Sequence, residues 1–228
     1  MSLVVWLILM LVLLATIPLS WWIARRLLAA SRADWGRPWL NVLDGANRIF
    51  CRRFHRLRPV QVPLPAHGAA LVVANHVSGL DPLLMIAASH RPLRFLIARE
   101  QYRRFGLQWL FRAVGCIPVE RGGNTHRALA AARRALQRGE VVALFPQGRI
   151  HLDHEAPARL KRGIAHLAKL SGAPVVALRI DGVRGAGDTL WAVFLRSRAR
   201  LTVFSPVYYE DAEPERMMET LERQLGKP

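Results

Sequence analysis

From residue 59 onward, short apolar runs alternate with stretches whose apolar residues recur at helical spacing. The runs predict β-strands, at 69–74, 93–98, 116–119, 141–145, 174–180, 191–196 and 201–207. The intervening stretches predict α-helices, at 82–89, 99–113, 124–138, 159–171 and 213–225. Strands that alternate with helices favour an α/β fold with a mixed, largely parallel sheet flanked by helices.

The length of 228 residues is enough for one such domain with an appendage. We therefore expect two parts, membrane-anchoring helices over 1–58 and an α/β domain over 59–228. With 52% apolar and 21% charged residues, the chain is not of the disordered class. Its two cysteines, Cys51 and Cys116, lie far apart and indicate neither a disulfide scaffold nor a zinc finger.

Residues 3–24 carry no charged side chain. At about 1.5 Å per residue, a helix of this length just spans a hydrocarbon core of about 30 Å. Trp21 and Trp22 stand where an interfacial aromatic belt belongs, and Arg25 and Arg26 follow. Basic residues follow the segment and none precedes it, so the positive-inside rule places the rest of the chain in the cytoplasm.

Two other interpretations of this N-terminal segment stay open. A cleaved signal peptide normally has a positive n-region and a shorter apolar core, and here the n-region is uncharged. Pro18 lies within the apolar run, so a helix that dips into one leaflet of the membrane is the third interpretation.

The next segment, about residues 37–58, predicts an amphipathic basic helix. Its apolar residues recur at helical spacing, at Trp39, Val42, Leu43, Ala46, Ile49, Phe50, Phe54 and Leu57. Arginines flank that stripe, at Arg48, Arg52, Arg53, Arg56 and Arg58. Such a helix suits an anionic headgroup layer. A helix packed on the domain core with a solvated basic face is the alternative, and the sequence does not decide between them.

The net charge of +17 predicts an anionic partner. Nucleic acid, anionic lipid surfaces and phosphorylated substrates all fit such a field. Nucleic acid leaves the apolar N-terminus unexplained, and no aromatic-basic RNA signature is present, so we expect no nucleic-acid partner.

A histidine and an aspartate stand five positions apart in "VVANHVSGLDP", residues 72–82. The apolar run predicts a strand end, and Asp81 followed by proline predicts a helix start. His76 then lies on a strand-to-helix loop, where α/β sheets place ligand chemistry. A compact turn through Ser78 and Gly79 brings the carboxylate back onto the imidazole, which makes His76 a candidate general base. The alternative is that Asp81 is only a helix cap.

Three further motifs follow in order: "GCIPVERGG" at 115–123, "ALFPQGR" at 143–149 and "GAPVVALRI" at 172–180. Together with the His-x4-Asp spacing, they resemble the glycerolipid and lysophospholipid acyltransferase family, of which 1-acylglycerol-3-phosphate acyltransferase is the bacterial type member. The resemblance covers about residues 70–180.

This resemblance implies roles for particular residues. His76 would be the general base on the acceptor hydroxyl, and Asp81 would orient it. Arg121 would bind the acceptor phosphate and Glu120 would hold that arginine or touch the glycerol, while Val175 and its neighbours would help form the acyl-donor region. The remaining substrate-binding candidates match the family motifs and the basic positions beside them, at Phe145, Pro146, Gln147, Gly148, Arg149, Arg99 and Lys161.

One departure concerns the third motif. The family usually has a glutamate where this chain has Gln147, and a threonine or serine where it has Arg149. Both changes make the acceptor pocket more positive, so they bear on the acceptor's identity more than on the reaction.

The resemblance implies a membrane-bound O-acyltransferase on a bacterial-type inner membrane, with its catalytic domain facing the cytoplasm. It would move a fatty acyl group from acyl-CoA or acyl-carrier protein to a lysophospholipid, with 1-acylglycerol-3-phosphate giving phosphatidic acid as the first expectation. Alternatives are another acceptor, such as lyso-ornithine lipid, or a catalytically weak lipid-binding relative.

No cofactor beyond the acyl thioester co-substrate is expected. The histidines of "HLDHE", residues 151–155, do not match the HExxH zinc pattern, so we expect no metal site. A hydrolase would need a nucleophile, and the chain has no G-x-S-x-G elbow.

Overall fold

The computed structural model of the protein describes residues 3–120, 125–152, 155, 159–209 and 214–226. Its helices are α1 (Leu3–Ala30), α2 (Pro38–Arg53), α3 (Asp81–Ala88), α4 (Arg99–Tyr102), α5 (Gln108–Ala113), α6 (His126–Gln137), α7 (Gly163–Ser171), α8 (Trp191–Phe194) and α9 (Pro214–Leu225). Its strands are β1 (Ala70–Ala74), β2 (Leu93–Ala98), β3 (Ile117–Val119), β4 (Val141–Leu144), β5 (Val175–Asp181) and β6 (Arg200–Val203).

The strands form one sheet in the order β3-β2-β4-β1-β5-β6. The first five run parallel, and β6 is antiparallel to β5. The central strand β1 pairs with β4 and β5, with Ala70 opposite Val141 and Leu71 opposite Val175. The largely parallel sheet expected from the sequence is therefore confirmed. Because the parallel strands point the same way, the loops that follow β1, β2, β3 and β4 gather at one edge of the sheet.

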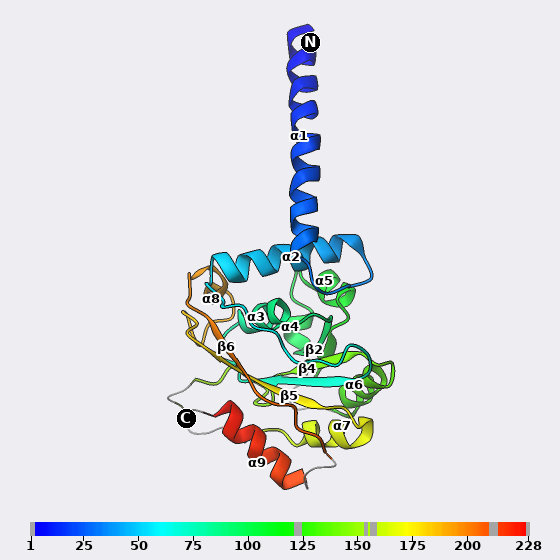
Figure 1. The fold of residues 1–228 in the computed structure, drawn as a ribbon, viewed down its shortest axis with the longest axis vertical. Coiled ribbons are helices and arrows are strands. Elements are labelled where there is room, and N and C mark those ends of the chain that lie inside the picture. Colours follow the sequence, from blue (N-terminus) through cyan, green and yellow to red (C-terminus); the bar gives the residue numbers. More distant parts are fainter. Residues whose placement is uncertain (1–2, 121–124, 153–154, 156–158, 210–213, 227–228) are drawn as a thin grey trace.

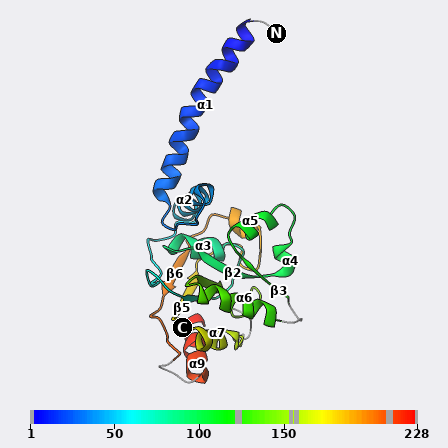
Figure 2. The same ribbon diagram turned by 90° about the vertical axis from the view of Figure 1, so that its right-hand side faces the viewer.

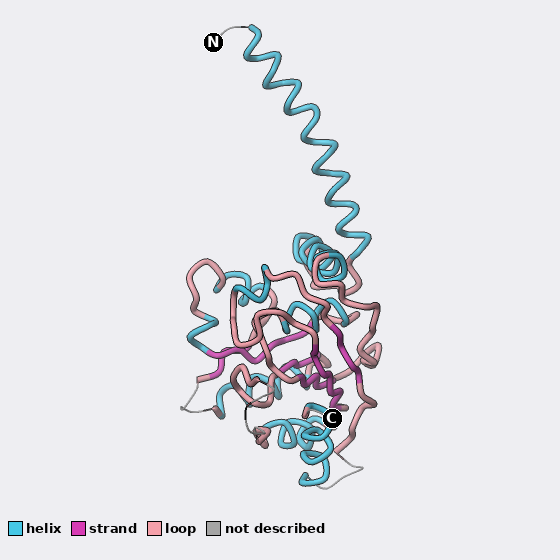
Figure 3. The backbone as a smooth tube through the Cα atoms, turned by 90° about the vertical axis from the view of Figure 1, so that its left-hand side faces the viewer, coloured by secondary structure: helices cyan, strands magenta, loops and turns pink. Residues whose placement is uncertain are grey.

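Two apolar clusters cover the two faces of the sheet. Side chains alternate between faces along a strand, so Val72 packs with α3 on one face, while Leu71 and Val73 pack with α6, α7 and α9 on the other. Figure 1 shows α6, α7 and α9 together on the side away from α1. Figure 3 shows the strands in the middle of the domain, between these helix layers.

Helix α1 extends away from the domain, and α2 lies across the end of the domain from which α1 leaves (Figures 1 and 2). A glycine makes the contact between these two helices close. A Cβ at Gly45 would stand 1.7 Å from the main-chain oxygen of Leu27, so a larger residue there would push α1 and α2 apart.

Helix α2 packs on the domain, as one of the two interpretations of the basic amphipathic segment expected. Arg48 is buried, donates to Asp44 at 2.6 Å and to the main-chain oxygen of Ala87 at 2.9 Å, and so binds α2 to the end of α3. Trp39 and Leu43 remain exposed on the same helix. The helix is thus packed on the domain and still presents apolar side chains outward.

Among the fully described residues, no helix is long and apolar enough to cross a membrane. The transmembrane span expected for residues 3–24 is therefore not supported by the fold.

Several expected elements differ from the observed ones, among them the following three. Residues 191–196 are not a strand, because the Asp188 carboxylate accepts the main-chain N–H groups of Leu190 and Trp191 at 2.8 and 2.9 Å and starts the short helix α8. The helix expected over 99–113 is two short helices, separated by a turn in which Gly106 has a φ of 78°. The last strand ends at Val203 rather than at 207.

Candidate active site

His76 and Asp81 form a directly bonded pair in the loop between β1 and α3. The Nδ1 atom of His76 lies 2.8 Å from Oδ2 of Asp81. A carboxylate only accepts hydrogen bonds, so the proton of the neutral imidazole is on Nδ1 and the Nε2 lone pair is left free. This geometry is the one that the His-x4-Asp spacing predicts for a general base.

The Asp81 carboxylate is buried and held by several donors. Its Oδ2 also accepts the main-chain N–H groups of Val77 at 2.7 Å and Ser78 at 2.8 Å, and the Ser78 hydroxyl donates to Oδ1 at 2.9 Å. Charge-assisted bonds of this kind stabilise a buried carboxylate. Asp81 is the first helical residue of α3, but the N-cap is Leu80 and no side chain caps the helix. The carboxylate of Asp81 therefore orients His76 instead of serving as the expected helix cap.

The main chain of His76 is held from the opposite side by the loop after β4. The Gln147 side-chain oxygen accepts the N–H of His76 at 3.0 Å, and the carbonyl of His76 accepts the N–H of His151 at 2.7 Å. The ring of Phe145 stacks on the imidazole at 4.0 Å between centroids. The third motif thus positions the histidine of the first.

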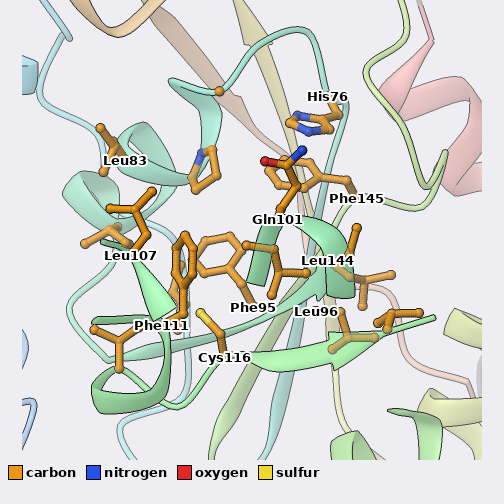
Figure 4. A pocket seen from close by; sticks show the side chains of 18 of the residues that line it. His76, Leu83, Phe95, Leu96, Gln101, Leu107, Phe111, Cys116, Leu144 and Phe145 are labelled. Carbon is orange, nitrogen blue, oxygen red and sulfur yellow. The ribbon is translucent and has the colours of Figure 1, made fainter. Parts of the chain in front are cut away.

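A cavity of about 700 Å³ extends from His76 into the domain. Figure 4 shows its lining as mostly apolar side chains, among them Leu83, Phe95, Leu107 and Phe111. The thiol of Cys116 also lines it, and burial raises the pKa of this thiol to about 11. A concave, mostly apolar site with a few polar groups suits a ligand that has a long hydrocarbon part.

Gly148 brings the third motif against residues 160–163, the "LKRG" stretch that contains Lys161. Its φ is 74°, and a Cβ there would stand 2.5 Å from Nζ of Lys161. The N–H of Lys161 donates to the carbonyl of Pro146 at 3.1 Å, and Pro146, Gly148 and Lys161 all line the cavity. A lysine ammonium is therefore present beside the histidine loop.

Two of the basic candidates are ion-paired. Arg99 and Glu120, which follow the neighbouring strands β2 and β3, pair with each other. Arg149 donates to Glu155 at 2.8 Å. The main-chain N–H of Leu152, followed by the charges of Arg149 and His151, lowers the pKa of Glu155.

Two further expected roles concern the acceptor phosphate and the acyl donor. Arg121 lies outside the described residues, and Glu120 pairs with Arg99 instead. Val175 is fully buried at the start of β5 opposite Leu71, which is the far end of the sheet from His76. Its expected place in an acyl-donor region does not agree with that position.

The structure adds residues that the motifs did not single out as part of the site. Ser78 donates two hydrogen bonds to Asp81, and its position inside the His-x4-Asp loop could have indicated this role from the sequence. His151 acts through its main chain, and main-chain contacts between distant loops leave no side-chain signal in a sequence. The buried Asn75 exchanges two hydrogen bonds with Ile180 and fixes the end of β1 against β5.

A comparison with protein families identifies the class of protein to which this fold and this histidine site belong. A family model described as Acyltransferase matches residues 52–181, and the chain belongs to that family. Within it, the chain is a member of the glycerolipid acyltransferases related to 1-acylglycerol-3-phosphate acyltransferase, as the motifs indicated.

Individual relatives agree with this placement. The chain is 32% identical over 133 residues to N-acylphosphatidylethanolamine synthase of Arabidopsis thaliana, an alignment that covers 54% of this chain and 45% of the relative. It is 30% identical over 136 residues to a probable 1-acyl-sn-glycerol-3-phosphate acyltransferase of Mycoplasma pneumoniae, over 57% of this chain and 49% of the relative. The chain thus spans about half the length of these two relatives.

The fold resembles a solved structure. The crystal structure of the 1-acyl-sn-glycerophosphate (LPA) acyltransferase PlsC from Thermotoga maritima matches with a TM-score of 0.61 at 21% identity, over 84% of this chain and 80% of that chain. This likeness establishes the fold.

Proposed function

We propose that the protein transfers a fatty acyl group from a thioester carrier, acyl-CoA or acyl-carrier protein, to the hydroxyl of a lysophospholipid. The observation that carries the proposal is the opening of the His76–Asp81 pair onto an apolar cavity of about 700 Å³. A base alone would suit many reactions. A base at the end of an apolar cavity suits chemistry on the head of a long-chain molecule.

The reaction needs no covalent acyl-enzyme. Nε2 of His76 takes the proton of the acceptor hydroxyl while the hydroxyl oxygen attacks the thioester carbonyl. The tetrahedral intermediate collapses, the C–S bond breaks, and the thiolate leaves with the proton that His76 carries. The buried Asp81 carboxylate stabilises the imidazolium that forms between these steps.

The preferred acceptor is 1-acylglycerol-3-phosphate, with phosphatidic acid as the product. The loops around His76 carry basic side chains that suit a phosphate, with Lys161 in the cavity lining and Arg149 on the same loop as Gln147. We assign Arg121 to the same acceptor phosphate, since a planar guanidinium binds phosphate at two points. The relative from Mycoplasma pneumoniae, by its name, uses this acceptor class.

Gln147 supports an active enzyme rather than an inactive relative. Its amide oxygen accepts the main-chain N–H of His76, a contact that a glutamate oxygen would make equally well. The substitution therefore preserves the support of the base and changes the charge beside the acceptor.

The proposed location is a membrane surface on the cytoplasmic side of a bacterial-type inner membrane. Helix α1 presents large exposed apolar side chains, including Trp6, Leu14 and Ile17. At its domain end, the guanidinium of Arg25 lies 4.6 Å from the ring centroid of Trp21, an aromatic-basic arrangement that suits a headgroup layer. At a membrane surface, an enzyme whose acceptor is a membrane lipid has direct access to that substrate.

The test is acyl transfer by the purified, detergent-solubilised protein, with His76→Ala as the control. The donors are labelled acyl-CoA and labelled acyl chains on acyl-carrier protein. The acceptors are lysophosphatidic acid, lysophosphatidylglycerol, lysophosphatidylethanolamine and lyso-ornithine lipid. We expect His76-dependent turnover of lysophosphatidic acid. Turnover of another acceptor alone would keep the reaction and reassign the acceptor, and absence of turnover with every pair would overturn the proposal.

A further inference from the structure

Four arginines line a second, separate cleft of about 400 Å³ at the surface of the domain. Its lining consists of Gly182, Ser197 and the arginines Arg56, Arg184, Arg196 and Arg198. These come from three stretches of chain: the end of the α2 segment, the loop after β5 and the loop before β6. No acidic residue is among the lining residues in the described part of the chain. A concentration of guanidinium groups in a lining without an acidic side chain favours an anion.

The loops that carry these arginines are fixed to one another. The buried Ser197 hydroxyl accepts the N–H of Arg184 at 3.0 Å and donates to the carbonyl of Leu195 at 2.9 Å. The N–H of Arg198 donates to Gly182 at 3.2 Å, and a Cβ at that glycine would stand 2.3 Å from the Arg198 carbonyl oxygen. The main-chain positions that carry these arginines are therefore fixed relative to one another.

Arg56 enters the cleft from an unfavourable backbone conformation. Its φ is 52°, and among the described residues it is the one non-glycine residue with a positive φ. Residues other than glycine avoid a positive φ unless the surrounding structure requires it, and such outliers concentrate at functional positions. Its neighbour His55 is buried, and its carbonyl accepts the N–H of Ala199 at 3.0 Å.

An exposed apolar surface adjoins the arginine cleft. Helix α8 leads directly to Arg196 along the chain, and its Trp191 and Phe194 are each 68% exposed. Their ring centroids lie 6.3 Å apart, and Leu190 beside them is 45% exposed. Aromatic and basic side chains side by side are typical of surfaces that enter the interface of an anionic membrane.

The position of α8 agrees with a membrane contact. Both views show α8 at the end of the domain from which α1 leaves, next to α2 (Figures 1 and 2). The ring Nε2 of His55, just beyond α2, bonds the carbonyl of Val193 in α8 at 3.1 Å. Val193 and Leu190 also line the apolar cavity that ends at His76, so α8 lies between that cavity and the outer surface.

We propose that the arginine cleft and α8 form a second membrane contact, in which the arginines bind the phosphate of an anionic phospholipid while Trp191 and Phe194 enter the interface. This inference rests on the proposed membrane location and is independent of the acyl-transfer chemistry. Docking through α8 brings the lipid surface to the wall of the apolar cavity. An anionic bilayer is favoured over nucleic acid because the exposed rings and leucine extend the cleft with apolar area.

The test places a nitroxide label at a single cysteine, Leu195→Cys, in the full chain with Cys51→Ala and Cys116→Ala, reconstituted in nanodiscs. Nanodiscs of phosphatidylcholine alone are compared with nanodiscs that also contain phosphatidylglycerol, and accessibility to oxygen and to a water-soluble nickel complex is measured. We expect the label to move from water into the interface when phosphatidylglycerol is present. The triple change Arg184→Gln, Arg196→Gln and Arg198→Gln should abolish this shift.

The matched control removes three exposed arginines from α6 and α9, by Arg133→Gln, Arg134→Gln and Arg216→Gln. These helices cover the other face of the sheet, so the shift should persist. An equal loss in this control would reduce the effect to net charge and overturn the proposal. A second outcome also overturns the proposal: the label stays in water, and inorganic phosphate binds the native cleft but not the triple variant. The arginine cleft would then be a site for a free anion.

A second label, Leu14→Cys on α1, separates the two proposals. If the α1 label is in lipid and the label at 195 stays in water with phosphatidylglycerol, the arginine contact fails and the membrane location stands. If both labels stay in water, the proposed membrane location is wrong and so is the arginine contact.

Discussion

Nδ1 of His76 lies 2.8 Å from Oδ2 of Asp81, and the same carboxylate oxygen accepts two main-chain N–H groups from the intervening turn. The turn between the two residues therefore fixes the Asp81 carboxylate, and the carboxylate in turn orients the His76 ring. These bonds all lie within the six residues from His76 to Asp81, so the local turn itself positions the base.

Replacing Asp81 by asparagine should lower kcat by about a thousandfold, within the range that loss of an orienting carboxylate costs. The amide keeps an acceptor for the turn but no longer stabilises an imidazolium. Initial rates with saturating donor and acceptor check this. The exposed Asp34 accepts a local main-chain N–H at 2.9 Å, and Asp34→Asn provides a carboxylate-to-amide control that should retain activity. A kcat of Asp81→Asn within tenfold of the native value would contradict the orienting role.

Gln147 should support His76 through shape and hydrogen bonding rather than through charge. Gln147→Glu preserves an oxygen acceptor for the N–H of His76, so we expect kcat within about tenfold of the native value. Gln147→Leu has a similar size and leaves that N–H unpaired, at a cost of about 1–3 kcal/mol. Rates and melting temperatures of the two variants check this, and equal loss in both would remove the hydrogen bond from the explanation.

The apolar cavity should set the acyl length. Leu107→Trp adds bulk to its lining, so kcat/KM should fall for long-chain donors and be retained for short ones. A donor series of increasing chain length measures the ratio. Phe105→Trp lies on the same loop with a fully exposed side chain and serves as the control. A uniform loss at all lengths in Leu107→Trp would argue against a cavity that holds the chain.

Cys116 should report occupancy of that cavity. Burial raises its thiol pKa to about 11, so only about one molecule in a thousand carries the thiolate at pH 8. With Cys51→Ala, Cys116 is the single thiol of the chain. Alkylation by iodoacetamide should be slow at pH 8, accelerate about tenfold per unit as the pH rises toward 11, and slow further with a bound long-chain acyl thioester. Labelling at the rate of a free thiol would contradict the burial.

His55 should make the protein less stable in acid. Burial lowers the pKa of His55 below 6.5, its ordinary value, and the ring lies against Phe50 and Phe54. The unfolded chain therefore binds a proton on this residue where the folded protein does not. Its contribution to stability is complete above about pH 6.5 and is lost as the pH falls below that value.

Melting temperatures between pH 5 and 8 check this dependence. His55→Gln should give a flatter profile than the native chain, because glutamine does not titrate. His67 is exposed, and His67→Gln should leave the native profile unchanged. An unchanged profile for His55→Gln would assign the acid sensitivity to other groups.

The sequence alone determined the alternation of strands and helices, the largely parallel sheet and the loop that carries His76 and Asp81. Each depends on neighbours along the chain: a run of apolar residues forms a buried strand, and Asp-Pro begins a helix. Local rules fail where distant residues compete. Residues 191–196 have the composition of a strand, but the Asp188 carboxylate accepts the N–H groups of Leu190 and Trp191, helix α8 forms over Trp191–Phe194, and β6 takes the edge of the sheet.

Tertiary structure decided what lies around the base. The contacts of Gln147 and His151 with the main chain of His76 cross more than seventy positions, and no local pattern encodes such a pairing. The same holds for the arginine cleft, whose members are ordinary surface arginines in the sequence. They converge because the antiparallel pairing of β5 with β6 places the loop after β5 and the loop before β6 at the same end of the sheet, where the end of the α2 segment also lies.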